Sequence, residues 1–163
     1  MMEKRSEEEK LLFRFQAACV RREYCVSDMR KKILKAVEND ARKAEDLLSK
    51  LVEDRFVSDS RYAAAFAREK ASISGWGPAK IRYALSGKGI ASSVIAEALE
   101  EIDGASASRR MNKVLEAKWK LLKDDPQGKY KLIRFGLSRG YSYDSVSEFL
   151  SELQASVLSG ESF

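Results

Sequence analysis

The sequence predicts an all-α protein, built as an elongated and curved tandem array of three three-helix modules. Three observations support this fold class. The chain has 163 residues but only two prolines, so long stretches lack the residues that end helices. Apolar residues recur every three or four positions in several segments, which is typical of helices with one buried face. A sequence pattern also repeats at a spacing of 51 or 52 residues.

The repeat is clearest in the second half of the chain. Residues 81–86 (IRYALS) align with residues 133–138 (IRFGLS), and residues 88–90 (KGI) align with residues 139–141 (RGY). A weaker first copy covers residues 27–52. One unit of this size buries little apolar surface alone, whereas stacked units share a core. The repeat therefore predicts an array of modules without one central cleft.

Each module is predicted to contain three helices in the same order. The first helices are expected at residues 10–22, 60–72 and 108–122. The second helices are expected at residues 27–36, 78–86 and 129–138. The third helices are expected at residues 41–53, 92–101 and 143–153. The predicted parts of the chain are thus a tail, three modules and a second tail, at residues 1–9, 10–57, 58–103, 104–155 and 156–163.

The predicted breaks between helices contain suitable residues. Pro78 stands at a first helical position, where its missing N–H costs nothing. Ser58 or Asp59 is placed to cap the helix that follows. Gly89 and Gly140 lie between second and third helices, where a left-handed residue is needed to turn the chain.

The composition excludes several classes of enzyme site. The chain has no histidine, so His general bases, Ser-His-Asp triads and His-containing metal sites are all excluded. The two cysteines, Cys19 and Cys25, fit neither a zinc cluster nor a disulfide framework. We therefore expect reduced thiols, no metal and no cofactor. The charged N-terminus and the lack of a long apolar run predict a cytoplasmic protein outside the membrane.

Charge follows the repeat. The formal net charge of +5 conceals basic segments that contain the first and second helices, and acidic segments that contain the third. The basic segments are residues 10–35, 61–88 and 109–139, with net charges of +6, +5 and +7. The acidic segments are residues 36–59, 90–103 and 140–163, with net charges of −3, −4 and −4.

One interpretation of this pattern is a basic strip that binds a polyanion. The predicted nucleic-acid-binding or filament-binding residues are Arg22, Arg30, Lys31, Arg61, Arg68, Lys80, Arg82, Lys118, Lys120, Lys131 and Arg134. Arg21 belongs to the same strip. The alternative is that these cations are solvated or pack beside acidic third helices. Glu97 and Glu101 on one third helix argue against its insertion into a DNA major groove, because phosphates would repel them.

Three aromatic residues have two interpretations each, and a fourth has one. Tyr62 and Phe66 have the helical spacing of core residues, although exposed rings could stack on bases. Trp76 could be an interface residue, or it could pack against Ile81 as a hydrophobic staple. Trp119 is expected to be buried, with the neighbouring lysine side chains extending outward.

The central stretch resembles the bacterial RecX family. The resemblance rests on residues 58–63 (SDSRYA), 66–68 (FAR), 75–81 (GWGPAKI) and 88–90 (KGI), together with Leu85. Upstream, residues 21–29 (RREYCVSDM) resemble the entry to the first module of that family. The similarity covers about residues 15–153. One departure is the turn at residues 37–40, which has no glycine, but Asn39 can adopt the left-handed conformation.

The resemblance implies a regulator of the RecA recombinase. Members of the family are tandem three-helix proteins that bind the groove of the RecA–DNA filament, suppress ATP hydrolysis and strand exchange, and favour disassembly. They are not enzymes. The expected partners are then the RecA filament and single- and double-stranded DNA, with the protein acting as a monomer. Two alternatives remain open, a non-specific DNA-binding helical protein and an enzyme that uses carboxylate or lysine chemistry.

Overall fold

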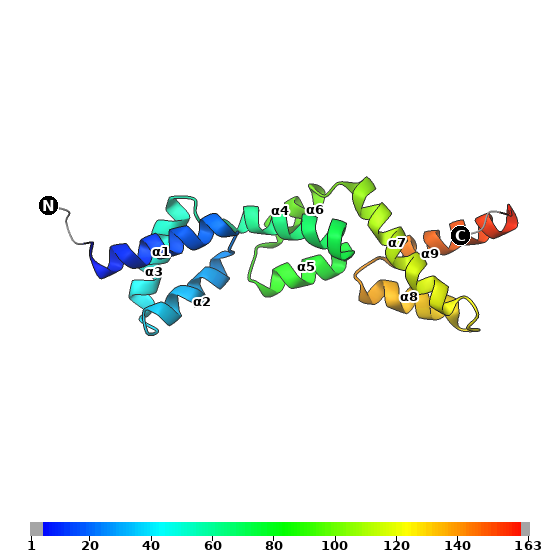
Figure 1. Ribbon diagram of the computed structural model, residues 1–163, viewed down its shortest axis with the longest axis horizontal. Helices are drawn as coiled ribbons and strands as arrows, with labels where there is room; N and C mark the ends of the chain where they lie inside the picture. The colour runs from blue at the N-terminus through cyan, green and yellow to red at the C-terminus, as the bar shows by residue number, and fades with distance from the viewer. Residues whose placement is uncertain (1–4, 161–163) are drawn as a thin grey trace. The chain divides into compact units, whose positions relative to one another are not determined.

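A computed structural model describes residues 5–160 of the chain (Figure 1). Within these residues there are nine α-helices, one short π-helical turn and no strand. The helices follow one another in groups of three, so the predicted all-α class and its three-helix modules are confirmed.

The first three helices are α1 (Glu7–Arg21), α2 (Val26–Ala36) and α3 (Ala41–Glu53). The side chains of Ser6 and Asp40 precede α1 and α3, and each accepts a hydrogen bond from the third N–H of its helix. These caps satisfy N–H groups that have no partner inside the helix. The helices pack through the apolar stripe of α3, which contacts both α1 and α2.

The middle helices are α4 (Asp59–Glu69), α5 (Pro78–Gly87) and α6 (Ser92–Glu100). Pro78 begins α5, as its position in the sequence predicted. Helix α4 ends earlier than expected, because residues Lys70–Ser74 form a wider π-helical turn that stops at Gly75. Such turns accommodate an extra residue in a helix.

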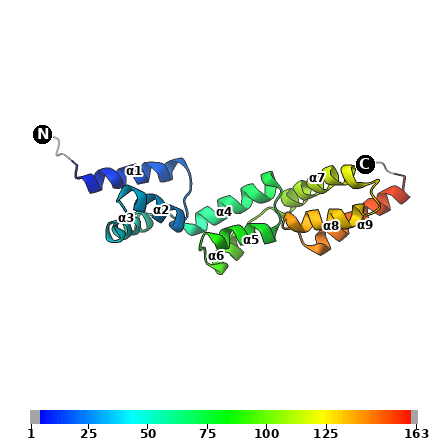
Figure 2. The same ribbon diagram turned by 90° about the horizontal axis from the view of Figure 1, so that it is seen from below.

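The last helices are α7 (Gly104–Leu122), α8 (Gly128–Ser138) and α9 (Tyr143–Leu158), which pack against one another (Figure 2). Helix α9 extends three residues into the segment predicted to be a loose tail, so that tail prediction was wrong for residues 156–158. Val157 and Leu158 line a pocket beside Trp119, although their side chains are 70% and 89% exposed. The rest of that tail includes residues 161–163, which lie outside the described residues.

The predicted N-terminal tail was also longer than the one observed. It was expected to reach residue 9, but α1 begins at Glu7, directly after its Ser6 cap. The first four residues of that predicted tail lie outside the described part of the chain.

The chain divides into two compact units. The first comprises Met1–Ala65 with Leu85–Ala96, and the second comprises Phe66–Ala84 with Glu97–Phe163, so the division passes through α4, α5 and α6. The core cluster of the first unit consists of Phe15, Met29, Ile33, Ala44, Leu47, Leu48, Leu51 and Val57. The core cluster of the second unit consists of Leu115, Leu132, Tyr141, Val146, Phe149, Leu150 and Leu153.

The turns between second and third helices have the expected backbone. Gly89 and Gly140 adopt left-handed conformations, with φ of 75° and 93°. In the first module Asn39 does the same, with φ of 64°, and Glu38 precedes it with φ of 52°. The missing glycine therefore leaves this turn with two non-glycine residues in the sparsely populated left-handed region.

A joint within the first unit connects the turn after α5 to the start of α2. The Ser27 hydroxyl donates a hydrogen bond of 2.7 Å to the Lys88 carbonyl oxygen. The Lys88 ammonium group donates to both carboxylate oxygens of Asp28, at 3.0 and 2.9 Å. At the same end of α2, the Val26 N–H donates to the Asp59 carboxylate at 2.8 Å. Side chains thus make most of this joint.

A joint within the second unit connects the turn after α8 to the start of α5. The Gly77 N–H donates to the Arg139 carbonyl oxygen at 2.7 Å, and the Ala79 N–H donates to the Gly140 carbonyl oxygen at 3.1 Å. A Cβ atom on Gly77 would lie 2.2 Å from the carbonyl carbon of Gly140. The two backbones therefore meet at a distance that only glycine permits.

Two side chains close this second joint. The Arg139 guanidinium donates to the carbonyl oxygens of Ser74 and Gly75, and the buried Tyr141 hydroxyl donates to the Gly75 carbonyl oxygen. The π-helical turn ends at these carbonyl groups. The repeated sequence at residues 88–90 and 139–141 is therefore, in both units, the turn that docks one module onto its predecessor.

The joint of the first unit is expected to weaken in acid. Partial burial raises the pKa of Asp28, but hydrogen bonds from Lys88 and Cys25 and the positive charge of Lys88 outweigh it, so this pKa lies below its usual value. The same hydrogen bond raises the pKa of Lys88. Because the pKa of Asp28 is lower in the folded state, the ionised carboxylate stabilises the fold at pH values above its unfolded pKa of about 3.9. This stabilisation is lost as the pH falls through the folded-state pKa.

Urea unfolding at pH 7 and pH 3 measures this contribution. Because both groups are partly exposed, we expect a loss of about 1 kcal/mol or less. Asp28→Asn should reduce the difference between the two pH values, whereas the control Asp124→Asn, at an exposed position, should leave it unchanged. Equal acid sensitivity of the wild-type and Asp28→Asn proteins would contradict the prediction.

Candidate nucleic-acid interface

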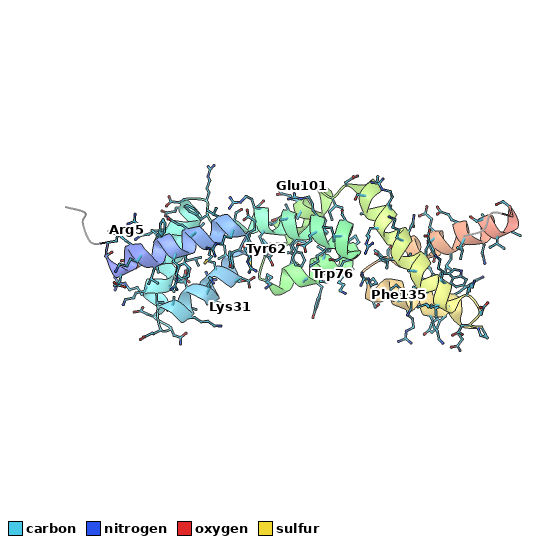
Figure 3. All side chains as sticks on the ribbon, in the orientation of Figure 1. Arg5, Lys31, Tyr62, Trp76, Glu101 and Phe135 are labelled. Atoms are coloured by element: carbon cyan, nitrogen blue, oxygen red, sulfur yellow. The ribbon has the colours of Figure 1, made fainter. Side chains whose placement is uncertain are left out.

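Two predicted binding residues of the first unit are exposed and have no ion pair among the described residues. Arg22 follows α1, and its guanidinium carbon lies 4.3 Å from the centre of the Tyr24 ring. Lys31 lies on α2 (Figure 3). Both are available to an anionic partner.

The two other predicted residues of the first unit are engaged within the fold. Arg30 pairs with Glu45 at 2.7 Å, which connects α2 to α3. Arg61 pairs with Glu23 at 3.0 Å, and its guanidinium also donates to the Arg55 carbonyl oxygen at 2.7 Å. These contacts reduce the positive charge that the two arginines present to a partner.

The middle helices place three predicted residues in the second unit. Arg68 and Arg82 are exposed on α4 and α5. The Lys80 ammonium lies 4.4 Å from the centre of the Trp76 ring. Arg82 also lines a mainly apolar pocket that includes Trp76 and Met111.

Trp76 is a partly buried centre of packing in this unit. The ammonium of Lys70 lies 4.8 Å from its ring centre, and the Phe66 ring meets it edge-on with centroids 6.0 Å apart. Figure 3 labels its position. The Trp76 ring therefore packs inside the unit and also lines the pocket, and its two interpretations stay predictions.

The last module places four predicted residues on two helices. On α7, the Lys118 ammonium lies 5.1 Å from the Phe135 ring centre, and Lys120 is exposed. Lys118 and Lys120 are two residues apart, so they do not face the same direction. Trp119 lies between them and packs on the core of the second unit, but it is half-buried rather than buried as expected.

On α8, Lys131 and Arg134 are one turn apart and lie on one helix face. Lys131 pairs with Asp125 at 2.6 Å, and the Arg134 guanidinium lies 5.9 Å from the Tyr130 ring centre. Tyr130 itself is 60% exposed. This face therefore combines two cations with an aromatic ring, one cation being partly neutralised.

The eleven predicted residues thus differ in availability. Arg30, Arg61 and Lys131 have carboxylate partners. Arg22, Lys80, Lys118 and Arg134 lie over aromatic rings. The remaining four, which are exposed and have no ion pair among residues 5–160, are Lys31, Arg68, Arg82 and Lys120.

The sequence pattern missed part of a basic groove on the first unit. Helices α1 and α2 form a shallow depression lined by four cations and three alanines, which are Arg14, Arg21, Lys32, Lys35, Ala17, Ala18 and Ala36. Only Arg21 was assigned to the predicted strip. The seven-residue spacing of Arg14 and Arg21, which places both on one helix face, was the available signal.

The described residues contain no fully buried charged side chain and no group of three or more acidic or cysteine side chains that could hold a metal ion.

Burial and the nearby Glu23 raise the pKa of the Cys19 thiol above its ordinary value, so this cysteine stays protonated at neutral pH. Among the described helices, none combines the length and apolarity that a membrane crossing requires.

Two family models match the chain. Residues 58–99 match the model described as RecX, second three-helix domain, and residues 109–150 match RecX, third three-helix domain. These ranges contain most of α4 to α6 and of α7 to α9.

Curated relatives named Regulatory protein RecX are similar over much of the chain. The Clostridium tetani protein is 30% identical over 146 residues, which cover 79% of this chain and 67% of that protein. The Pseudomonas putida protein is 35% identical over 108 residues, 66% of this chain and 68% of that protein. The Clostridium perfringens SM101 protein is 32% identical over 107 residues, 63% of this chain but only 50% of that protein. The chain therefore spans about half the length of some relatives.

Solved structures share the fold. A crystal structure of regulatory protein RecX matches with a TM-score of 0.78 at 23% identity, over 88% of this chain and 71% of that chain. RecX from Lactobacillus salivarius matches with a TM-score of 0.73 at 20% identity, over 88% of this chain and 97% of that chain. With both three-helix models and relatives of 30% and 35% identity matched, the chain belongs to the RecX family.

Proposed function

We propose that this protein regulates the RecA recombinase by binding the groove of the RecA–DNA filament. Bound there, it suppresses ATP hydrolysis and strand exchange and favours disassembly, without catalysing a reaction of its own. Membership of the RecX family supports a regulatory role, since the relatives are named Regulatory protein RecX. The partners are the RecA filament and single- and double-stranded DNA.

The observation that carries the proposal is the repeated joint. In each unit a basic residue followed by glycine turns the chain and docks one module on the start of the preceding second helix. One chain thereby carries similar surfaces in succession. A partner that is itself a repeating polymer suits such a chain, because successive protomers present the same site again and again.

The proposed contacts are the eleven basic residues already described. The four exposed cations without carboxylate partners, Lys31, Arg68, Arg82 and Lys120, contribute most, because no ion pair within the described fold must be broken to use them. The mechanism is a population shift: binding that is tighter to an inactive filament geometry than to the active one favours the inactive geometry. Equal affinity for both geometries would change nothing.

The test is the DNA-dependent ATPase activity of preformed RecA filaments, titrated with this protein well below one molecule per RecA protomer. We expect inhibition at these low ratios. The double variant Arg68→Glu/Arg82→Glu should inhibit at least tenfold less effectively, because charge reversal at two exposed contacts costs more than about 1.4 kcal/mol of binding. The control Arg42→Glu/Lys43→Glu changes two exposed cations of α3 that are outside the predicted set and should behave like wild type.

Two results would contradict the proposal. Unchanged filament binding after charge reversal at Arg68 and Arg82 would exclude these two residues as filament contacts, contrary to their expected main contribution. No effect on ATP hydrolysis, together with tight and salt-sensitive binding to naked DNA, would instead support the alternative of a non-specific DNA-binding helical protein.

A further inference from the structure

The groove between α1 and α2 lies in a part of the chain that neither family model matches, since those matches begin at residue 58. All its lining residues belong to the first unit. All four of its cations lie in the basic segment at residues 10–35, but apart from Arg21 none was assigned to the predicted strip. None of its lining residues is among the eleven proposed filament contacts.

The groove has a regular arrangement of cations. Arg14 and Arg21 are separated by two helical turns, about 10 Å along α1. Ala17 and Ala18 occupy the turn between them. On α2, Lys32 and Lys35 are one turn apart and share a face. The result is two rows of cations along a floor of small residues.

All four cations are exposed, and none forms an ion pair within the described part of the chain. No carboxylate lines the groove. By contrast, Arg30 on the same helix α2 is paired with Glu45. The groove thus concentrates one sign of charge without internal neutralisation, which creates a locally positive potential.

We propose that this groove binds the phosphodiester backbone of nucleic acid. Two rows of cations spaced over about 10 Å can neutralise several successive phosphates, and an alanine floor lets the backbone approach closely. An acidic protein segment fits less well, because protein interfaces depend on apolar anchors in pockets and this floor has only methyl groups. Backbone contacts carry no base information, so the binding is independent of sequence.

The experiment measures the affinity of the full chain for oligothymidylate and for a duplex of mixed sequence, without RecA, between 50 and 200 mM salt. For Arg21→Gln/Lys32→Gln, the slope of log affinity against log salt should fall by about 1.4 for single strands and about 1.8 for duplex. The wild type should therefore lose about sevenfold more single-strand affinity than the variant over this salt range.

The matched control is Arg42→Gln/Lys43→Gln, which removes the same charge from α3 of the same unit. Its slope should match that of the wild type. An unchanged slope for the groove variant, or an equal fall for the control, would overturn the proposal. So would displacement of the oligonucleotide by polyglutamate at equal charge concentration, which would indicate an acidic protein partner. The two nucleic-acid probes decide between single-strand and duplex ligands.

Folding is checked by the helical circular dichroism and melting temperature of each variant, because exposed substitutions should change stability by less than about 0.5 kcal/mol. The absence of RecA makes this result independent of the proposed regulatory function. If the groove binds DNA but the protein has no effect on the RecA ATPase activity, the proposal for the groove is supported and only the proposed regulatory function is rejected.

Discussion

Gly77→Ala is expected to destabilise the second unit by about 3 kcal/mol, the upper range for overpacking. Its Cβ atom would lie 2.2 Å from the carbonyl carbon and 2.3 Å from the carbonyl oxygen of Gly140. Because both contacts are backbone atoms, no side chain can move to relieve them. The joint must open, with loss of the hydrogen bond from the Gly77 N–H to the Arg139 carbonyl oxygen.

Urea unfolding, followed by the fluorescence of the adjacent Trp76 in a Trp119→Phe background, measures the loss. Gly87→Ala is the matched control, since it lies at the other end of α5 and nothing approaches its Cβ position within 4 Å. That control should be neutral or stabilise the protein by up to about 1 kcal/mol, because alanine favours helix over glycine. Similar stability of the two variants would refute a close backbone contact at this joint.

Arg139→Met is expected to destabilise the same unit by about 2 kcal/mol. The guanidinium donates to the carbonyl oxygens of Ser74 and Gly75, where the π-helical turn ends. Methionine preserves much of the side-chain volume but makes no hydrogen bond. The Ser74 carbonyl oxygen then loses the Arg139 donor, and the Gly75 carbonyl oxygen keeps only the Tyr141 hydroxyl. Hydrogen bonds to charged groups contribute about 1.5–3 kcal/mol, which sets this magnitude.

A double-mutant cycle with Tyr141→Phe isolates the shared acceptor, since the Tyr141 hydroxyl also donates to the Gly75 carbonyl oxygen. We expect the two losses to be non-additive, because the carbonyl becomes wholly unsatisfied only in the double variant. Arg134→Met, at an exposed position on α8, is the control and should change stability by less than about 0.5 kcal/mol. An Arg139→Met protein as stable as wild type would show that the Arg139 side chain does not stabilise the joint.

The helices were predictable from local signals. The stripe of Leu47, Leu48 and Leu51 indicated α3, and each is buried. Pro78 marked the first residue of α5, and Gly140 marked the left-handed turn before α9. These signals involve residues within a few positions of one another, which is why a single sequence contains them.

The binding residues were less predictable. Charge counting grouped Arg30 and Arg61 with Lys31 and Arg68 as equivalent cations. Arg30 and Arg61 differ from the others only because folding brings carboxylates to them, from 15 and 38 residues away. Counting along the sequence cannot detect pairs at such separations, and it also missed most of the α1–α2 groove, whose two rows of cations come from different helices.

The sequence by itself determined an all-α chain of repeated three-helix modules, because helix periodicity, caps and glycine turns act over one or two turns of backbone. Only the tertiary structure decided what the repeated turns do. The Lys88 side chain meets Asp28 across 60 residues, and the Arg139 side chain meets Ser74 across 65. Contacts at that distance depend on how folded modules pack, so the role of these turns as joints became evident only when the modules were placed together.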